Sequence, residues 1–252
     1  PGAMAPDWFM IEAPASTAAM GRSVTSCGDI SGDGLADLII GAFGSATIGA
    51  RIGRVNGRAY PAATTGLVTI AGTGFITIDS AGIGTALSDP VACIGDYDND
   101  GDLDLGAYRA TSNAGGVRIY LQSGGTFTGL PPLDILNDTA APSGDYFGLS
   151  IGLGFHPMLG TIGNVDRRQG SDLLLGSWQF GTGPGDVSLF YGAATVASTV
   201  RTAAVSWNPM TMDATGTRVA AYVGDVTGDG YPDFAIGDYN YMSNAGRVLI
   251  YY

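Results

Sequence analysis

Lysine is absent from this 252-residue chain, and its 11 basic residues, all arginine, are outnumbered by 23 acidic ones, for a formal charge of −12. A surface of that sign repels the phosphates of nucleic acids and anionic membranes instead of neutralising them. Long apolar runs are also missing, and none approaches the ~18 residues that a membrane-spanning helix requires. The sequence therefore argues against nucleic acid as a partner and against insertion of this domain into a membrane.

Histidine occurs once and cysteine twice. His156 lies in a Gly-Phe-His-Pro segment typical of a loop, and no Ser/His/Asp motif surrounds it. We therefore assign no catalytic residue and expect a domain that is not an enzyme. Cys27 and Cys93 lie two and three residues before neighbouring acidic loops. They either form a disulfide in an oxidising compartment or are two small buried side chains.

Patterns of long amphipathic helices are missing as well. Instead, the chain has 41 glycines, and short segments rich in strand-forming residues alternate with turn signals. This composition is typical of many short strands joined by tight turns. We expect an all-β fold in a single domain spanning residues 1–252.

One acidic nine-residue pattern is present at 29–37, 96–104 and 225–233. Oxygen-bearing side chains at positions 1, 3, 5 and 9, with glycine at position 6, suit a calcium ion that needs six to eight oxygen ligands. An Asp/Gly-rich turn without metal is the alternative for one loop, but three copies in phase favour about three structural Ca²⁺ ions. The expected side-chain ligands are Asp29, Ser31, Asp33 and Asp37; Asp96, Asp98, Asp100 and Asp104; and Asp225, Thr227, Asp229 and Asp233, with the main-chain carbonyls of Leu35, Asp102 and Tyr231 at position 7.

A fourth copy at 164–172 is degraded. It retains Asn164, Asp166 and Asp172 at positions 1, 3 and 9, but Arg168 replaces the acid at position 5. A guanidinium at that point can pair with the remaining acids and take the place of the ion. We expect weak calcium binding or none in this loop.

The four loops divide the chain into repeats of similar length. Their first positions are 67, 68 and 61 residues apart, and the remaining chain at the two ends is about as long as one more interval. Periods of this size are typical of propeller blades. We expect four blades of four antiparallel strands, with the loop between the first two strands, and with Trp8–Glu12 supplying the missing fourth strand of the last blade to close the ring.

Each repeat also places one aromatic residue two positions after the glycine that ends the second strand: Phe43, Tyr108, Trp178 and Tyr239. Four such rings around an axis could stack on a sugar or hold a cation. The alternative is that they pack between blades.

The acidic loops, the Phe147-Gly148 lead, and the Gly-Ala pairs at 41–42 and 106–107 resemble the FG-GAP repeat of integrin α-subunit β-propellers. That family usually has seven blades, so four repeats imply either a compact ring or part of a larger one. The resemblance implies a calcium-stabilised, secreted or cell-surface module for protein binding or cell adhesion, with its ligand on the face opposite the metal loops. A carbohydrate-binding lectin and a non-catalytic domain of a larger secreted enzyme are the alternatives.

Overall fold

The computed structural model describes residues 9–12, 20–42, 51–55, 66–69, 75–79, 87–109, 115–136, 159–161, 164, 168–177, 186–195, 197–200, 205–207, 219–238 and 241–252. In these residues the chain is almost entirely strand and turn. The one helical segment, α1 (Tyr241–Asn244), is a single turn in which Met242 and Ser243 have left-handed backbone angles. The all-β class predicted from composition is confirmed.

Besides one two-stranded parallel pair described below, the strands form four successive sheets, each built mainly from the antiparallel strands of one repeat. Sheet 1 contains β2 (Met20–Thr25), β3 (Leu38–Ala42), β4 (Arg51–Val55) and β6 (Phe75–Asp79). Sheet 2 contains β7 (Leu87–Gly95), β8 (Asp104–Arg109), β9 (Gly116–Ser123) and β10 (Thr126–Leu136), with β14 (Thr199–Val200) added in parallel beside β10. Sheet 3 contains β11 (Leu159–Thr161), β12 (Leu173–Ser177), β13 (Asp186–Phe190) and β15 (Val205–Trp207), and sheet 4 contains β16 (Val219–Gly224), β17 (Asp233–Asp238) and β18 (Arg247–Tyr251).

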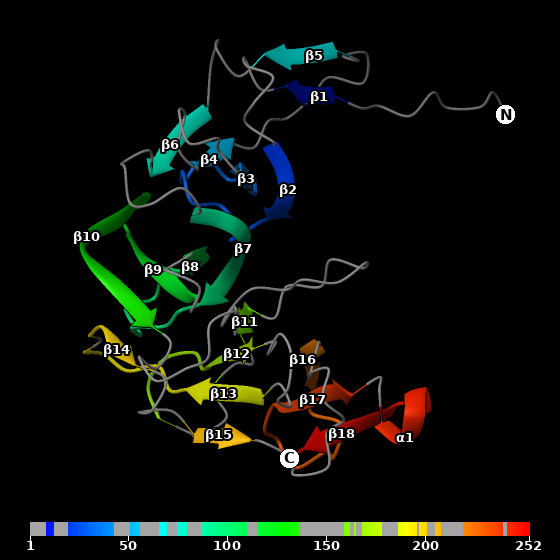
Figure 1. The fold of residues 1–252 in the computed structure, drawn as a ribbon. Coiled ribbons are helices and arrows are strands. Elements are labelled where there is room, and N and C mark those ends of the chain that lie inside the picture. The colour runs from blue at the N-terminus through cyan, green and yellow to red at the C-terminus, as the bar shows by residue number, and fades with distance from the viewer. Residues whose placement is uncertain are drawn as a thin grey trace, which may run out of the picture.

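Figure 1 shows the four sheets following one another along an arc, with the strand pair β1 (Phe9–Glu12) and β5 (Gly66–Thr69) beyond sheet 1 at one end and sheet 4 at the other. The first strands of successive sheets lie against one another, β2 against β7, β7 against β11, and β11 against β16. Each sheet therefore packs face to face on the next, as the repeat pattern predicts.

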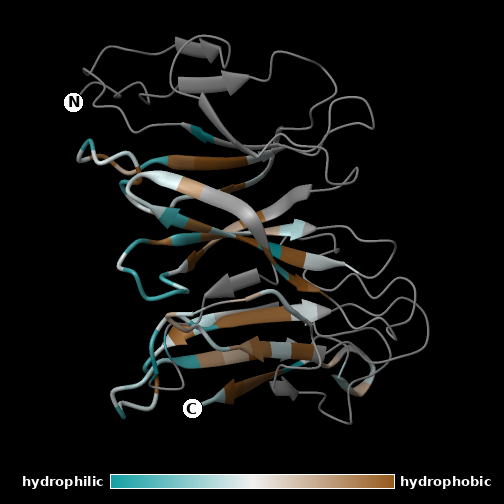
Figure 2. Cartoon of the chain, turned by 90° about the vertical axis from the view of Figure 1, so that its left-hand side faces the viewer, coloured by the Kyte–Doolittle hydropathy of each residue, from teal (hydrophilic) through white to brown (hydrophobic). Residues whose placement is uncertain are grey.

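Three apolar clusters fill the spaces between successive sheets. Strand alternation points every second side chain to the same face, so each sheet has a leading face toward the preceding sheet and a trailing face toward the following one. The clusters are Cys27, Ile30, Ile39, Val91, Leu105, Ala107 and Tyr120 between sheets 1 and 2; Ala92, Ile94, Tyr97, Val117, Ile119, Leu133, Ile135, Leu173, Leu175 and Phe190 between sheets 2 and 3; and Leu174, Val187, Leu189, Phe234 and Ile236 between sheets 3 and 4. Figure 2 shows these apolar strand segments stacked through the molecule.

The prediction that the N-terminal strand completes the last repeat is wrong. β1 (Phe9–Glu12) pairs in parallel with β5 (Gly66–Thr69), in the connection between β4 and β6 of the first repeat. Pairing within the first repeat closes a shorter stretch of chain than pairing with sheet 4 would, and so has a smaller entropic cost. Among the described residues, sheet 4 has three strands and β18 is its outer edge.

A disulfide joins sheets 1 and 2. Cys27 and Cys93 are bonded, with their Cα atoms 5.3 Å apart and a sequence separation of 66. Of the two alternatives that the sequence left open, the structure contains the disulfide, and Cys27 is also buried in the cluster between the two sheets.

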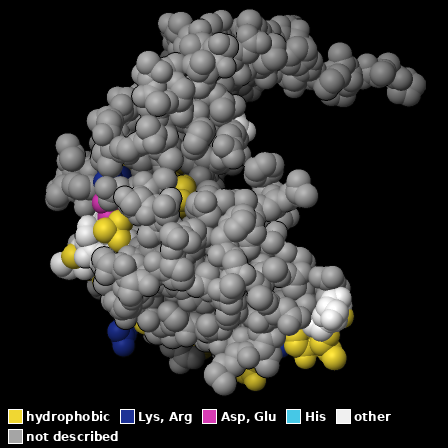
Figure 3. Space-filling model, viewed as in Figure 1, with side chains coloured by type: hydrophobic (Ala, Val, Ile, Leu, Met, Phe, Trp, Pro, Cys, Tyr) yellow, Lys and Arg dark blue, Asp and Glu magenta, His cyan; other side chains and the backbone are white. Residues whose placement is uncertain are grey.

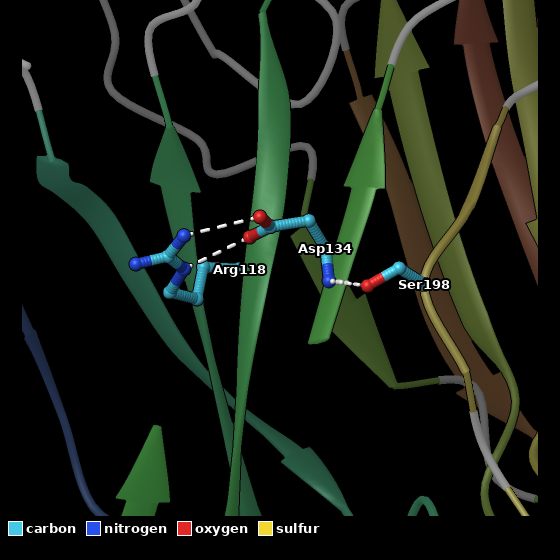
Figure 4. Close-up of polar contacts among 3 residues, drawn as sticks. All are labelled: Arg118, Asp134 and Ser198. Atoms are coloured by element: carbon cyan, nitrogen blue, oxygen red, sulfur yellow. Dashed lines mark hydrogen bonds and ion pairs between the residues drawn. The ribbon is translucent and has the colours of Figure 1, made fainter. Parts of the chain in front are cut away.

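A buried ion pair joins the two outer strands of sheet 2, and a neighbouring hydrogen bond links that sheet to the third repeat (Figure 4). Arg118 of β9 donates from Nε to Asp134 Oδ1 at 2.8 Å and from Nη2 to Asp134 Oδ2 at 3.0 Å. The main-chain amide of Asp134 donates to the Ser198 hydroxyl at 2.9 Å. This two-pronged contact satisfies both charges inside the protein, where a lone charge would be costly.

Candidate metal centre

The acidic loops occupy the same place in every sheet. Each joins the first strand to the second, and its ninth residue stands at the start of the second strand: Asp37, Asp104, Asp172 and Asp233. All four of these carboxylates are buried. In Figure 2 the hydrophilic loops lie together on the left-hand side, which is one face of the stack of sheets.

The carboxylate at position 1 organises the turn in all three intact loops. Asp29 accepts from the amides of Asp33 at 3.0 Å and Gly34 at 2.6 Å. Asp96 accepts equivalently from Asp100 and Gly101, at 2.9 and 3.0 Å, and Asp225 accepts from Asp229 and Gly230, at 3.0 and 2.8 Å. The same two amides are bound in each loop, so the three backbones follow the same path.

Glycine at position 6 permits that path. Gly34, Gly101 and Gly230 have φ values of +89°, +100° and +88°, a region that side-chain-bearing residues rarely adopt. One residue later, the amide at position 7 donates at 2.9 Å to the position 5 carboxylate in every loop, in Asp33, Asp100 and Asp229. The acidic side chains are thereby held around the inside of the turn.

The carboxylate at position 9 closes the loop from the strand side. Asp37 Oδ2 accepts from the amide of Ser31 at 2.7 Å, and Asp233 Oδ2 accepts from the amides of Val226 and Thr227 at 2.8 and 3.1 Å. Asp104 accepts from Tyr97 at 2.8 Å and from Gln122, at the end of β9, at 2.9 Å. The Gln122 donor was not predicted, because a main-chain amide from a distant strand leaves no sequence signal.

The second loop gathers three carboxylates most tightly. Oxygens of Asp96, Asp98 and Asp104 all lie within 4.8 Å of one another. Asp98 Oδ1 is buried without a hydrogen-bond partner, and so is Asp233 Oδ1 of the fourth loop. A buried, unpartnered carboxylate oxygen is costly, and a hard cation satisfies it. The donor set therefore fits calcium, which prefers carboxylate and carbonyl oxygens.

The electrostatics of the loops agree with this interpretation. Burial raises the pKa of Asp104 to about 7, although the amides of Gln122 and Tyr97 act in the opposite direction. Burial, followed by the charge of Asp100, also raises the pKa of Asp98. At the exposed entrance of the first loop, the amide of Gly34 instead lowers the pKa of Asp29. The buried carboxylates of the second loop therefore resist ionisation unless positive charge is supplied.

The side chain of Asp102 points away from the loop interior. Its Oδ2 accepts from the amide of Gly124 at 3.1 Å, in the turn between β9 and β10. This contact agrees with its expected role as a main-chain ligand, in which only its carbonyl would reach an ion.

The degraded third loop has a different conformation. Its glycine with positive φ, Gly170 at +92°, stands at position 7 and not at position 6. Asn164 Nδ2 donates to the Arg168 carbonyl, and Asp172 accepts from the amide of Gly192 at 3.1 Å. The Arg168 guanidinium lies 5.9 Å from the centre of the Tyr191 ring. Asp166 lies outside the described residues, so its expected pairing with Arg168 stays a prediction.

The third loop instead docks on the second. The amide of Ser171 donates to the Asp96 carbonyl at 2.6 Å, and beside it the amide of Ala193, in the segment after β13, donates to the Tyr97 carbonyl at 3.0 Å. Gly170 lies so close that a Cβ atom there would be 2.5 Å from the Tyr97 carbonyl oxygen. The third loop thus packs against the backbone of the second loop and holds it in place by hydrogen bonds.

Of the four aromatic residues expected at a ligand rim, only Tyr108 is among the described residues. It is 5% exposed and is paired across the sheet with Val117, on the trailing face of sheet 2. Phe43, Trp178 and Tyr239 lie outside the described residues, as does His156. Tyr108 itself packs between sheets and does not present its ring to solvent.

Comparison with known proteins identifies the family of one repeat, the fourth. No curated protein matches the sequence significantly. No helix in the described part of the chain is both long and apolar enough to cross a bilayer. Residues 218–251, which comprise all of sheet 4 and the fourth acidic loop, match the FG-GAP repeat. The chain therefore contains an FG-GAP repeat at its C-terminal sheet, as the resemblance of its motifs predicts.

Proposed function

We propose that this domain is an extracellular, calcium-stabilised β-propeller module, similar to the head of integrin α-subunits, which binds a protein partner in cell adhesion. Its four sheets are propeller blades, it has no catalytic activity, and its ions are structural. The FG-GAP repeat at residues 218–251 supports the propeller module.

The observation that carries this proposal is the shared hydrogen-bond frame of the three intact loops. Each loop folds its position 1 and position 5 carboxylates onto the same main-chain amides, the second loop gathers three carboxylates within 4.8 Å of one another, and two of the loops leave a buried carboxylate oxygen unpartnered. A turn that needed no metal would gain nothing from so many carboxylates converging, since like charges at this spacing repel.

Calcium would be held by positions 1, 3, 5 and 9 through side chains and by position 7 through its carbonyl. When bound, it neutralises the clustered carboxylates of a loop. The protein's own contribution is to hold position 1 with main-chain amides and to bury position 9 at the start of the second strand. Because calcium binds the folded loops and not the unfolded chain, its binding raises the free energy of unfolding.

The disulfide between Cys27 and Cys93 supports an extracellular location. Structural disulfides persist in oxidising compartments and are rare in the cytosol. Extracellular calcium modules bind their ion with dissociation constants of about 10⁻⁴–10⁻³ M, and solvent-exposed loops such as 225–230 suit that range. Calcium therefore stabilises this domain wherever the ion is abundant.

The partner site lies on the face opposite the acidic loops in this proposal, as in the family that the motifs resemble. A protein partner is favoured over a sugar because Tyr108 is buried between sheets, which removes one ring from the aromatic set that a lectin would use. Sugar binding is the competing outcome and is tested in the same experiment.

The first test is calcium titration of the chelated protein by calorimetry, with Mg²⁺ as the control ion, together with thermal melts. We expect about three calcium sites and a melting temperature that rises by several degrees. Cells should then adhere to a surface coated with the domain in calcium and detach on chelation, while a glycan array stays blank. If calcium produces no heat of binding and leaves the melting temperature unchanged, the proposed metal sites are wrong. Saturable binding to a glycan would instead identify a lectin.

A further inference from the structure

One strand position of sheet 1 departs from the pattern of the other sheets. Two residues after the last position of each acidic loop, the second strand pairs with a residue on the trailing face of the third strand. That residue is Ile119 in sheet 2, Leu189 in sheet 3 and Ile250 in sheet 4. In sheet 1 it is Arg54 of β4, which pairs with Ile39 and is 8% exposed. An arginine thus occupies a buried place that is aliphatic in the other sheets.

The Arg54 guanidinium has little to compensate its charge. Its Nη1 donates to the Gly125 carbonyl at 2.7 Å, in the turn between β9 and β10 of sheet 2. Its Nε is buried without a hydrogen-bond partner, and no carboxylate pairs with Arg54 among the described residues. A buried guanidinium with one neutral acceptor costs more free energy than an aliphatic side chain in the same place. Packing between sheets 1 and 2 therefore does not account for Arg54, whereas its contact with the turn sets it apart.

The turn that Arg54 contacts also holds the second acidic loop. At the end of β9, the Gln122 amide donates to Asp104 Oδ1 at 2.9 Å. Two residues later, the Gly124 amide donates to Asp102 Oδ2 at 3.1 Å. The two acceptors stand at positions 9 and 7 of the loop. The path of the turn therefore determines where the last third of this loop lies.

On its other side, the turn packs closely on the first acidic loop. A Cβ atom on Gly125 would lie 2.9 Å from the Ile30 carbonyl oxygen. Gly124 and Gly125 both have positive φ, +55° and +84°, which glycine adopts without a steric penalty. The preceding sheet thus fixes the turn twice, by the Arg54 hydrogen bond and by this backbone contact.

We propose that Arg54 is a positioning residue of the calcium site in the second loop. It acts from the neighbouring sheet, through the Gly125 carbonyl and the turn, on Asp102 and Asp104, and it does not touch the ion. This role rests on the calcium site proposed above and adds to it a residue outside every acidic loop. Groups that orient metal ligands from behind contribute about 10–100-fold in metal affinity.

Charge and position predict opposite effects of removing Arg54. A cation near a calcium site repels the ion, so loss of its charge alone would strengthen binding. Loss of the hydrogen bond to Gly125 would instead release the turn and weaken binding. A weaker site in Arg54→Met therefore reports positioning, because the change of charge acts in the other direction.

The test is calorimetric calcium titration of the full chain carrying Asp33→Asn and Asp229→Asn, which leave the second loop as the one intact acidic loop. In this parent, Arg54→Met is expected to lower the calcium affinity about tenfold at a temperature well below the melt. Arg54→Lys keeps a donor and the charge, and is expected to retain more affinity than Arg54→Met. Without calcium, hydrogen exchange at the Gln122 and Gly124 amides should be faster in Arg54→Met than in the parent.

Arg118→Met is the matched control for loss of a buried arginine. Arg118 pairs with Ala107 on the face of sheet 2 that meets sheet 1, and its guanidinium bonds to Asp134. Figure 3 shows basic and acidic side chains side by side over the outer strands of sheet 2. Because this pair joins β9 to β10 some way along the ladder from the turn, Arg118→Met should lose stability but keep the calcium affinity of the parent.

A second pair of variants tests the same turn without changing Arg54, in case Arg54→Met does not fold. Gly125→Ala brings a Cβ atom against the Ile30 carbonyl oxygen and displaces the turn. Gly124→Ala is its control, because a Cβ atom there meets nothing within 4 Å. The first should weaken the second calcium site, and the second should not.

The outcomes separate the role of Arg54 from the metal site itself. If the parent binds no calcium, the proposed site is wrong and the role of Arg54 falls with it. If the parent binds calcium and both Arg54→Met and Gly125→Ala keep its affinity, the positioning role alone is overturned. An equal loss of affinity in Arg118→Met would also overturn it, since any buried arginine would then have the same effect.

Discussion

The carboxylates of Asp98 and Asp104 converge from two sides of the second acidic loop, with oxygens within 4.8 Å of each other. Asp104 is held by the amides of Tyr97 and Gln122, whereas Asp98 Oδ1 is buried without a partner. The loop backbone thus fixes both oxygens of Asp104 and leaves one oxygen of Asp98 without a partner among the described residues. A cation between them would satisfy the second and offset the repulsion of both.

Replacing Asp98 with asparagine should abolish calcium binding in this loop. The amide is neutral and a poorer ligand for a hard cation, while its size is unchanged. Calorimetric titration should then find one site fewer than in the wild type, with the remaining sites unaffected because they lie in other sheets.

The matched control is Asp102→Asn in the same loop. It removes the same charge, but the Asp102 side chain contacts the Gly124 amide and not the loop interior. Its titration should keep the wild-type number of sites, with at most a modest loss of affinity from the lost charge. Loss of a site in Asp102→Asn but not in Asp98→Asn would contradict the ligand assignment.

The stability of the calcium-free domain should depend on pH in an unusual direction. Burial raises the pKa of Asp104 from 3.8 in the unfolded chain to about 7. Between these values the folded state holds a proton that the unfolded state has lost. The contribution of the Asp104 carboxyl to the free energy of unfolding is thus complete below about pH 4 and is lost as the pH rises through about 7.

Calcium should reverse that trend, because it binds the ionised carboxylates. The gap in melting temperature between calcium-loaded and calcium-free protein should widen from pH 5 to pH 7.5, a window in which carboxylates of ordinary pKa stay ionised. Thermal melts of protein stripped of metal on a chelating resin, with and without added calcium, measure this gap. A gap that narrows with rising pH would contradict the burial of Asp104 beside a calcium site.

The disulfide between Cys27 and Cys93 should stabilise the domain measurably. Closing a loop of 66 residues restricts the unfolded chain by about 4 kcal/mol in the chain-entropy account. The Cys27→Ser/Cys93→Ser double variant should therefore melt roughly 8–16 °C lower, at about 2–4 °C per kcal/mol for a chain of this size. Mass spectrometry of unreduced peptides establishes the bond first, and an identical melt in strong reductant would contradict it.

The repeat, the loop positions and the antiparallel sheets could be predicted because they depend on local signals. Each of these signals lies within a single repeat: the alternation of apolar residues in strands, the glycine at position 6 and the spacing of the aspartates. The pairing of β1 could not be predicted in this way. Phe9–Glu12 and Gly66–Thr69 are both short apolar segments, and nothing in either indicates its partner or its direction.

Contacts between segments far apart in the sequence could not be predicted either. The pairing of Cys27 with Cys93 remained one of two alternatives, because the distance between neighbouring sheets does not follow from composition. The amide donors to the buried aspartates lie 18 and 20 residues further along the same repeat, at Gln122 in β9 and at Gly192 just after β13. Main-chain donors are the same in every residue type, so only the fold reveals which ones reach the loops.

The docking of the third loop on the second gives the last prediction. Gly170 has φ +92°, and a Cβ atom there would lie 2.5 Å from the Tyr97 carbonyl oxygen and 2.9 Å from the main-chain carbon of Gly192. Both neighbours are backbone, so neither can move aside without shifting a loop. Gly170→Ala should therefore destabilise the domain through backbone strain and through this overlap together.

Gly21→Ala separates the two causes. Gly21 has nearly the same φ, +87°, but a Cβ atom there meets nothing within 4 Å. The free energy of unfolding from chemical denaturation should fall further in Gly170→Ala than in Gly21→Ala, by the 1–3 kcal/mol or so that overpacking costs. Because Ser171 also bonds to the Asp96 carbonyl, Gly170→Ala should weaken calcium binding in the second loop, whereas Gly21→Ala should not. Equal losses of stability in the two variants would mean that the third loop does not bear on its neighbour.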